Sequence, residues 1–177
     1  MTPSQKRALA ELWPKYGCEF STTPLEFKKL FGRDAPVVLE IGFGNGDTLV
    51  EQAAMSPDID FLGIEVHEPG VGHCLIAAND ASLENLRLII HDAIEVLDVQ
   101  VPPASLRRIN LYFPDPWPKK RHHKRRLIQP AFVAQLVPKL KPGGILHLAT
   151  DWENYAEQMM EVLSAAGGLD NTAGPGQ

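Results

Sequence analysis

Residues 37–55 read VVLEIGFGNGDTLVEQAAM. The first six residues are apolar except for Glu40, as in a short strand that is buried on both faces. Glycines at positions 42, 44 and 46 allow the backbone to turn tightly and to approach a ligand closely. DTLVEQAAM, over 47–55, has helical character. The stretch is therefore predicted to be a strand, a glycine turn and a helix, which is the repeating unit of parallel α/β sheets.

The same alternation of strands and helices continues to residue 166. The predicted strands are 37–42, 60–66, 86–91, 107–113 and 144–150. The predicted helices are 47–55, about 69–81, 92–98, 125–140 and 151–166. Because strands that alternate with helices build parallel sheets, we predict an α/β fold with a mostly parallel, Rossmann-like sheet and helices on both faces.

The remaining residues are assigned to the two ends of the chain. A short amphipathic helix is predicted over 4–13, and Thr23-Pro24 is interpreted as the start of another, because proline is favoured at the first helical position. Residues 1–36 are expected to form an N-terminal helical extension. Residues 167–177, GGLDNTAGPGQ, have no periodicity and are expected to form a flexible tail.

The charge of the chain is unevenly distributed. The 177 residues contain 17 Lys and Arg against 22 Asp and Glu, for a net charge of -5. Six of the cations lie within residues 119–126, and outside this run the count is 11 basic against 22 acidic residues. Positive charge that is focused on an acidic chain indicates a local anionic partner.

Cysteine use and hydropathy indicate the compartment. Cys18 and Cys74 fit neither a disulfide framework nor a zinc site, which indicates a reducing environment. No stretch approaches the ~18 apolar residues of a membrane span, and the N-terminus lacks the apolar core of a signal peptide. We therefore expect a cytoplasmic protein without a membrane anchor.

An acidic residue stands at the end of each predicted strand. These residues are Glu40, Glu65, Asp92, Asp115 and Asp151. In parallel sheets of this class, ligands bind at the carboxyl ends of the strands, where the strand order reverses. One such acid would be explained as a helix cap, whereas five together predict one shared ligand site.

The pattern E-x-G-x-G-x-G over residues 40–46 is typical of S-adenosylmethionine sites. The dinucleotide fingerprint would need a glycine where this chain has Asp47. A dinucleotide brings a pyrophosphate, whereas S-adenosylmethionine carries an ammonium and a sulfonium and favours nearby acids. Glu65 is expected to accept both ribose hydroxyls. The alternative is a turn with incidental glycines, and Asp92 is explained equally well as a helix cap or as an adenine contact.

Residues 113–117 read FPDPW and follow the fourth strand. Each proline fixes its own φ and is expected to hold the residue before it extended, so that Asp115 is held rigidly at the end of the sheet. Trp117 and Tyr112 offer flat faces on which a base can stack. A polar residue between prolines, followed by an aromatic residue, resembles the motif of amino-group methyltransferases. The alternative is a rigid loop whose tryptophan fills the core.

The basic run KKRHHKRR, residues 119–126, is expected to bind the phosphates of a nucleic acid. The alternative is the solvated start of a helix. His122 and His123 have no third ligand at a suitable spacing, so no metal site is predicted. Thr150-x-x-Glu153 is interpreted as a capping box, and Asp151 is then explained equally by the helix dipole or by contact with a substrate.

Five segments, in this order, resemble the bacterial tRNA (guanine-N7-)-methyltransferase family. They are EIGFGNG, DFLGIEVHEPGVG, HDAIEVL, FPDPWPKKRHHKRR and ATDWENYAE, and the resemblance runs from about Trp13 to Leu163. It implies an S-adenosylmethionine-dependent, class I methyltransferase domain over 37–166 that methylates N7 of a guanine in the tRNA variable loop. The implied donor contacts, with those of the glycine turn, are Glu40, Gly42, Gly44, Gly46, Glu65, Asp92 and Asp115. The implied tRNA or guanine contacts are Lys119, Lys120, Arg121, His122, His123, Lys124, Arg125 and Asp151.

Methylation of guanine N7 needs no strong base, because N7 has a free lone pair and no proton at neutral pH. The donor begins as a cation and leaves neutral, whereas the guanine becomes cationic. The site must therefore hold the two in line and offer negative potential where the new cation forms. We interpret Asp115 as the catalytic residue that provides this potential.

The family continues beyond the helix at 151–166 with a further strand pair and a Thr-x-x-Glu-like segment, which nothing in residues 167–177 matches. Without that strand pair, strand 144–150 is expected to have an unpaired edge that favours self-association. Methyl transfer is then expected to be weak or absent although the donor binds. Two other functions stay open, namely a small-molecule methyltransferase, which would not use the basic run, and an RNA-binding protein that transfers no methyl group.

Overall fold

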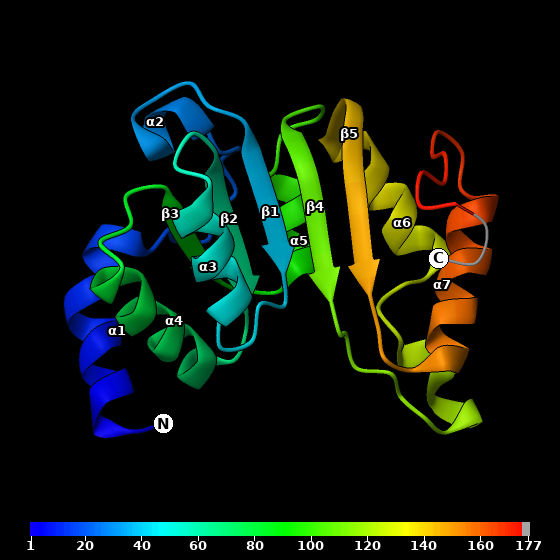
Figure 1. Ribbon diagram of the computed structural model, residues 1–177, viewed down its shortest axis with the longest axis horizontal. Coiled ribbons are helices and arrows are strands. Elements are labelled where there is room, and N and C mark those ends of the chain that lie inside the picture. Colours follow the sequence, from blue (N-terminus) through cyan, green and yellow to red (C-terminus); the bar gives the residue numbers. More distant parts are fainter. Residues whose placement is uncertain (175–177) are drawn as a thin grey trace.

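The computed structural model describes residues 1–174, which are arranged around one five-stranded sheet (Figure 1). The strands are β1 (Val37–Ile41), β2 (Asp60–Glu65), β3 (Leu86–Ile90), β4 (Leu106–Tyr112) and β5 (Leu140–Ala149). All neighbouring strands are parallel, and their order is β3-β2-β1-β4-β5. The predicted α/β fold with five parallel strands is confirmed, and the strand order reverses between β1 and β4.

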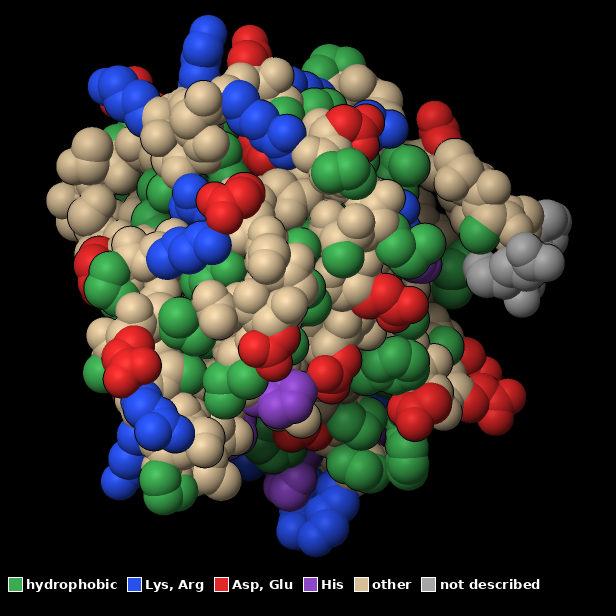
Figure 2. Space-filling view, turned by 60° about the vertical axis from the view of Figure 1, so that its left-hand side comes forward, with side chains coloured by type: hydrophobic (Ala, Val, Ile, Leu, Met, Phe, Trp, Pro, Cys, Tyr) green, Lys and Arg blue, Asp and Glu red, His purple; other side chains and the backbone are tan. Residues whose placement is uncertain are grey.

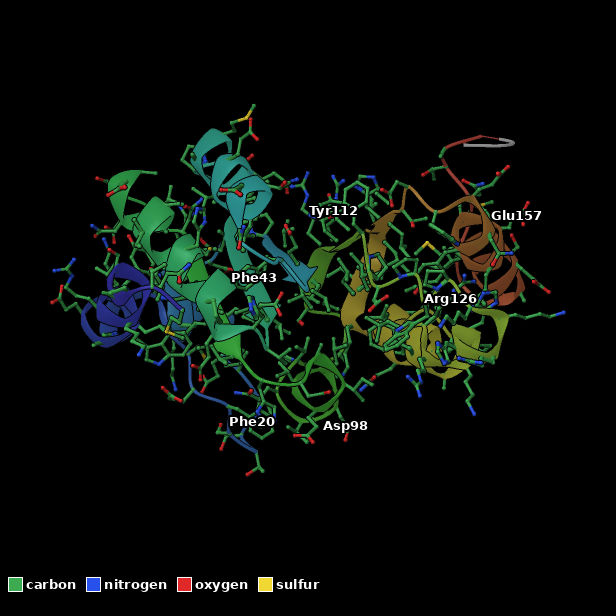
Figure 3. The ribbon with its side chains drawn as sticks, turned by 90° about the horizontal axis from the view of Figure 1, so that it is seen from below. Phe20, Phe43, Asp98, Tyr112, Arg126 and Glu157 are labelled. Atoms are coloured by element: carbon green, nitrogen blue, oxygen red, sulfur yellow. The ribbon has the colours of Figure 1, made fainter. Side chains whose placement is uncertain are left out.

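Helices cover both faces of this sheet (Figures 1 and 3). The helices are α1 (Pro3–Tyr16), α2 (Phe27–Phe31), α3 (Asp47–Met55), α4 (Glu68–Asp80), α5 (Ala93–Val99), α6 (Pro130–Leu136) and α7 (Glu153–Ala165), with the 3-10 turns η1 (Lys120–Arg125) and η2 (Val137–Lys139). Alternate residues of β1 enter different cores, because successive side chains of a strand point to opposite faces. Val37 and Leu39 pack with α5, α6 and α7, whereas Val38 packs with α1, α3 and α4.

The N-terminal helix is longer than predicted and joins the main core. It extends over Pro3–Tyr16 instead of 4–13, and Thr2 and Gln5 form a capping box at its start. Ala8 and Tyr16 are buried in the same core as α3 and α4, and the Tyr16 hydroxyl donates to the Ala78 carbonyl at 3.2 Å. The division of the chain at residue 36 stays a prediction.

The helix predicted over 125–140 is confirmed only in part, because prolines divide this segment into the α-helix α6 and the 3-10 turn η2. η1 ends at Arg125, and α6 begins only at Pro130. Pro130 occupies the first turn of α6, where no N–H donor is needed, and Gln129 before it is extended with ψ of 159°. Pro138 lies within η2, after which β5 begins at Leu140 rather than at residue 144.

The helix predicted to start at Thr23-Pro24 is also displaced. α2 begins at Phe27, with Glu26 as its N-cap. The Leu25 N–H donates to the Gln100 carbonyl at 2.8 Å, which holds the backbone before α2 against the end of α5. This contact between residues far apart in the chain overrides the local signal of the proline.

The end of the described chain follows α7. Residues 166–174 form no helix or strand, and Leu169 packs against the core under α5, α6 and α7. The flexible tail predicted over 167–177 includes residues 175–177, which lie outside the described residues. Within residues 1–174, no helix is long and apolar enough to cross a membrane.

Candidate active site at the carboxyl ends of the strands

The strands end together at one side of the molecule, the lower side in Figure 1. Because the strands are parallel, their carboxyl ends lie at the same side of the sheet. All five acidic positions predicted from the sequence lie at this side. Glu40 and Glu65 lie at the ends of β1 and β2, and Asp92, Asp115 and Asp151 follow β3, β4 and β5 within three residues. Figure 2 shows Asp, Glu and His side chains gathered on the lower part of the face that it presents.

The turn after β1 has the geometry that its glycines predict. Gly42, Gly44 and Gly46 have φ of 68°, 60° and 80°, a left-handed conformation that residues with a side chain rarely adopt. The Gly46 N–H donates to the Phe43 carbonyl at 2.9 Å and closes the turn before α3. A Cβ on Gly44 would meet nothing within 4 Å, so the space in front of the turn is open to a ligand.

Gly70, in the first turn of α4, packs against the glycine turn after β1. The sequence analysis did not identify this residue. A Cβ at position 70 would overlap the Gly44 carbonyl oxygen. The close approach of α4 to the glycine turn therefore requires a glycine there. The signal in the sequence is a glycine inside a predicted helix, which often has a packing reason.

Glu65 ties the glycine turn to the end of β2. Its Oε2 accepts the Gly44 N–H at 2.8 Å, and its Oε1 accepts the Val66 and His67 N–H groups at 2.7 and 3.0 Å. Each carboxylate oxygen offers two lone pairs, so Oε2 retains one acceptor site for a ligand. The contact with ribose hydroxyls stays a prediction, and the orientation of the turn is an additional role.

Glu40 is a buried carboxyl group with one oxygen that makes no hydrogen bond within residues 1–174. It is 3% exposed, and its Oε2 has no hydrogen-bond partner among the described residues. Burial raises the pKa of Glu40 to about 7. A buried and unpaired carboxyl group opposes folding, whereas a cationic ligand would compensate it. The positive charges of the ammonium and sulfonium groups of S-adenosylmethionine are complementary to such a carboxylate.

Asp92 caps the helix that follows β3. Its Oδ1 accepts the Ile94 and Glu95 N–H groups at 2.8 and 3.4 Å. The helix-cap explanation is therefore correct for one carboxylate oxygen. The cap leaves Oδ2 unused, and the contact with adenine stays a prediction for that atom.

The FPDPW loop after β4 is strained at both ends. Phe113 and Trp117 have φ of 50° and 43°, which is unusual for residues other than glycine. The expectation that each residue before a proline is extended is therefore wrong at Phe113 and at Trp117, which precede Pro114 and Pro118. The Phe113 N–H makes the last bond of the sheet, to the Ala149 carbonyl at 2.8 Å, and the chain turns directly afterwards. Strained backbone of this kind is concentrated at functional sites.

Asp115 and Trp117 are fixed relative to each other within this loop. The Trp117 N–H donates to Asp115 Oδ1 at 3.1 Å, and the Asp115 side chain is exposed. The Arg125 guanidinium lies 5.0 Å from the centre of the Trp117 ring, and the His122 ring stands edge-on to it. Trp117 belongs to neither core cluster, so the alternative in which it fills the core is not supported.

A cavity of about 320 Å³ joins the glycine turn to the FPDPW loop. Its walls include Gly42, Tyr112, Asp115, Trp117 and Arg125. It lies between the ends of β1 and β4, where the strand order reverses. Figure 3 looks onto this end of the sheet, with Phe43 of the glycine turn and Tyr112 of β4 near its centre.

A second hollow, of about 370 Å³, lies between α6 and α7. Its lining is aliphatic and includes Ala134, Val137 and Val162, with no titratable side chain. It offers no group that could bind or polarise a substrate. The smaller cavity at the strand ends is therefore the candidate active site.

The basic run forms an exposed surface beside that cavity. The exposed cations are Lys119, Lys120, Arg121, Lys124 and Arg125, and none of them pairs with a carboxylate within residues 1–174. His122 and His123 are half-buried. No group of three or more His, Cys, Asp and Glu side chains in the described part of the chain is arranged to hold a metal ion. The unpaired cations form a surface that suits phosphate groups.

Arg126, the last cation of the run, is not part of that surface. It is only 2% exposed, and it donates hydrogen bonds to the Pro116 carbonyl and to the side chains of Asn154 and Gln158. The interpretation of all of residues 119–126 as an RNA-binding surface is therefore wrong for Arg126. Nothing in the letters KKRHHKRR distinguishes this arginine from its exposed neighbours.

The capping box predicted from Thr150 and Glu153 is also wrong. Trp152 is the N-cap of α7 and makes no side-chain cap, while Thr150 Oγ1 accepts the Trp152 N–H at 3.2 Å. Asp151 lies before the N-cap and is exposed. The helix-dipole explanation of Asp151 therefore loses its basis, because Asp151 is outside the first turn. Its contact with a substrate stays a prediction.

Known sequences are similar to this chain over most of its length. A family model described as "Putative methyltransferase" matches residues 34–175. A protein of Aeromonas hydrophila named tRNA (guanine-N(7)-)-methyltransferase is 57% identical over 176 residues, which are 99% of this chain and 74% of the relative. A protein of the same name from Alcanivorax borkumensis is 57% identical, and the match covers 99% of this chain and 73% of that protein.

Solved structures share the fold at low sequence identity. A precorrin-6y C5,15-methyltransferase from Geobacter metallireducens superposes with a TM-score of 0.58 at 15% identity, over 90% of this chain and 68% of that one. An antibiotic-related methyltransferase superposes with a TM-score of 0.56 at 14% identity, over 81% and 76% of the two chains. These likenesses show the fold alone, which is that of class I methyltransferases. The family model and the close relatives go further, and the chain belongs to the tRNA (guanine-N(7)-)-methyltransferase family.

Proposed function

We propose that this protein transfers a methyl group from S-adenosylmethionine to N7 of a guanine in the variable loop of tRNA. The observation that carries the proposal is the cavity that contains both Gly42 and Asp115 and borders the exposed cations of the basic run. A donor on the glycine turn and a base beside Asp115 would share one space. The names of the close relatives support tRNA guanine as the substrate.

The donor side of this cavity suits a cationic nucleoside. When bound, S-adenosylmethionine supplies an electrophilic methyl group on a sulfonium centre. The backbone of residues 42–46 and the free lone pair of Glu65 Oε2 would bind and orient the donor. Glu40 would offset positive charge on the donor, and Asp92 Oδ2 would face the adenine.

The guanine side requires positioning and negative potential, not a strong base. Asp115 is the proposed catalytic residue, because an exposed carboxylate at the cavity stabilises the positive charge that develops on the purine. Trp117 offers a flat face to the base. Asp151 follows the carboxyl end of β5 and is proposed as a further contact to the guanine.

The RNA side is assigned to the basic run. The proposed tRNA contacts are Lys119, Lys120, Arg121, His122, His123, Lys124 and Arg125. Phosphate contacts of this kind position the substrate without reading its bases, so the guanine must be selected in the cavity. We assign the activity to residues 37–166 and, because tRNA is the partner, to the cytoplasm.

The test is incubation with labelled donor and an unmodified tRNA transcript, followed by digestion and base analysis. We expect the label in 7-methylguanine, and we expect it to be lost when the variable-loop guanine is replaced by adenine. Turnover without tRNA would favour a small-molecule methyltransferase. Binding of tRNA without any transfer would favour an RNA-binding protein and would contradict the proposal.

A further inference from the structure

We propose that Arg126 is a positioning residue that orients Asp115 by locking one peptide plane of the FPDPW loop. The inference rests on the proposed function. Arg126 is 2% exposed, and its three hydrogen-bond acceptors, Pro116, Asn154 and Gln158, are all neutral. A buried cation that has only neutral partners opposes folding. We therefore infer that the hydrogen bonds of Arg126 have a role in positioning the residues that accept them.

The peptide unit between Pro116 and Trp117 is held on both sides. Arg126 Nε donates to the Pro116 carbonyl at 2.7 Å, and the Trp117 N–H of the same peptide unit donates to Asp115 Oδ1 at 3.1 Å. A peptide unit is planar, so its carbonyl and its N–H rotate together. A rotation that broke the bond to Arg126 would also turn the Trp117 N–H away from Asp115. Arg126 therefore acts on the carboxylate through one rigid unit.

The loop needs such a restraint because its backbone is strained. Trp117 has φ of 43°, in the left-handed region that residues with a Cβ avoid. A strained residue persists only where the surrounding contacts determine its conformation. The hydrogen bond from Arg126 holds the carbonyl of Pro116, the residue directly before Trp117. Without this hydrogen bond, the loop would relax and the Asp115 carboxylate would lose its fixed direction.

The other side of the guanidinium is anchored in α7. Its Nη1 and Nη2 donate to Gln158 Oε1 at 2.7 Å and to Asn154 Oδ1 at 3.0 Å, and it lies 4.7 Å from the centre of the Tyr155 ring. Figure 3 shows Arg126 beside this helix. α7 begins two residues after Asp151. Arg126 thus links the loop that carries Asp115 to the helix that follows Asp151.

Only an arginine can make this link. Its planar fork donates in several fixed directions at once, whereas the ammonium group of lysine is a point charge on a flexible stem. Arg126→Lys therefore keeps the positive charge and removes the planar group that donates several hydrogen bonds in fixed directions. The matched control is Arg107→Lys, because Arg107 is exposed near the start of β4, at the opposite end of the sheet.

The primary measurement is amide hydrogen exchange at Phe113, Asp115 and Trp117, the three residues of 113–118 that have an N–H, with residues 42–46 as the internal reference. In Arg126→Lys we expect exchange in 113–118 to be about tenfold faster, with no change at 42–46. Methyl transfer in single turnovers should fall by about ten- to a hundredfold, the effect of a small misplacement of reacting groups. The dissociation constant of the donor should change by less than about twofold, well below what losing one contact causes. Arg107→Lys should change none of these values.

Unchanged exchange in 113–118 would overturn the proposal, as would a loss of transfer matched by an equal loss of donor affinity. If Arg126→Lys does not fold, Gln158→Met takes its place, because it removes one anchor and leaves the bond to Pro116. It should accelerate exchange in 113–118 in the same direction, and no acceleration would overturn the proposal. If the native protein transfers no methyl group to tRNA, the proposed function fails, and the exchange measurement, which needs no substrate, still decides the role of Arg126.

Discussion

Glu40 makes the stability of this protein depend on pH at the scale of a single residue. Its pKa is about 7 in the folded protein because of burial, against 4.5 for an ordinary glutamate. Between these two pH values the folded state retains a proton that the unfolded state has released. The stability therefore falls as the pH rises through this window and is constant above it. The total loss is up to about 3 kcal/mol.

Glu40→Gln removes this dependence, since the amide is neutral at every pH. We expect the variant to melt at a higher temperature than the native chain at pH 8 and at the same temperature at pH 4.5, measured by calorimetry without donor. Donor affinity at pH 8 should fall, because the offset of the donor's positive charge is lost. Glu51→Gln, at an exposed position of α3, is the control. Equal melting temperatures of the variant and the native chain at pH 8 would contradict the assignment of an unfavourable charge to Glu40.

Asp115→Asn separates charge from shape in the candidate active site. The amide oxygen can still accept the Trp117 N–H, so the loop should keep its conformation. Methyl transfer should fall on the order of a hundredfold, since the negative potential beside the base is lost. Donor affinity, measured by calorimetry, should change far less, and Asp98→Asn, at an exposed position of α5, should alter neither. Equal losses of transfer and of donor affinity would reduce Asp115 to a donor contact.

At the scale of elements, we expect η1 to set the affinity for RNA. If four of its cations meet phosphates, the slope of log affinity against log salt should be roughly -3 to -4. Replacing Lys120, Arg121, Lys124 and Arg125 with Gln should flatten this slope and leave donor affinity unchanged. Arg126 is retained, because it is buried and holds the neighbouring loop.

The control for that substitution is Lys28→Gln with Lys29→Gln. These two lysines are exposed on α2, at the upper end of the molecule in Figure 1, away from the ends of the strands. Filter binding or fluorescence anisotropy at several salt concentrations gives the slopes. An unchanged slope in the η1 variant, or an equal change in the α2 variant, would place the RNA surface elsewhere.

At the scale of the whole molecule, β5 is the outermost strand of the sheet that residues 1–174 form. β5 pairs with β4 on one side, and within residues 1–174 no strand pairs with its other side. Lys141 and Pro142 protect the beginning of that edge, since charge and proline oppose pairing. Residues 144–149 have no such protection, and Ile145 is 50% exposed. This edge is the proposed surface for self-association.

We expect the native chain to form dimers as its concentration rises, measured by sedimentation or light scattering. Ile145→Lys should abolish this association, because a charge on an edge strand opposes pairing with a second copy. Met55→Lys is the matched control, since Met55 is 77% exposed on α3 and away from the edge. A native chain that stays monomeric at every concentration would contradict the prediction.

The sequence by itself determined the features that depend on residues close together in the chain. The run VVLEI, three glycines and DTLVEQAAM predict β1, its turn and α3, and α3 has the predicted bounds Asp47–Met55. Such patterns are informative because burial on both faces and a left-handed turn restrict residue type locally. The parallel sheet follows from the repeated alternation of strands and helices. It places Glu40, Glu65 and Asp115 at the carboxyl ends of the strands.

Only the tertiary structure decided the features that depend on distant partners. Arg126 is buried because Asn154 and Gln158, about thirty residues later, accept its hydrogen bonds, and no local pattern separates it from Arg125. Phe113 combines a positive φ with a hydrogen bond to Ala149 in the neighbouring strand, a contact that the local sequence does not indicate. The raised pKa of Glu40 likewise arises from burial among other elements. Contacts of this kind are set when the elements pack, and periodicity and composition do not encode them.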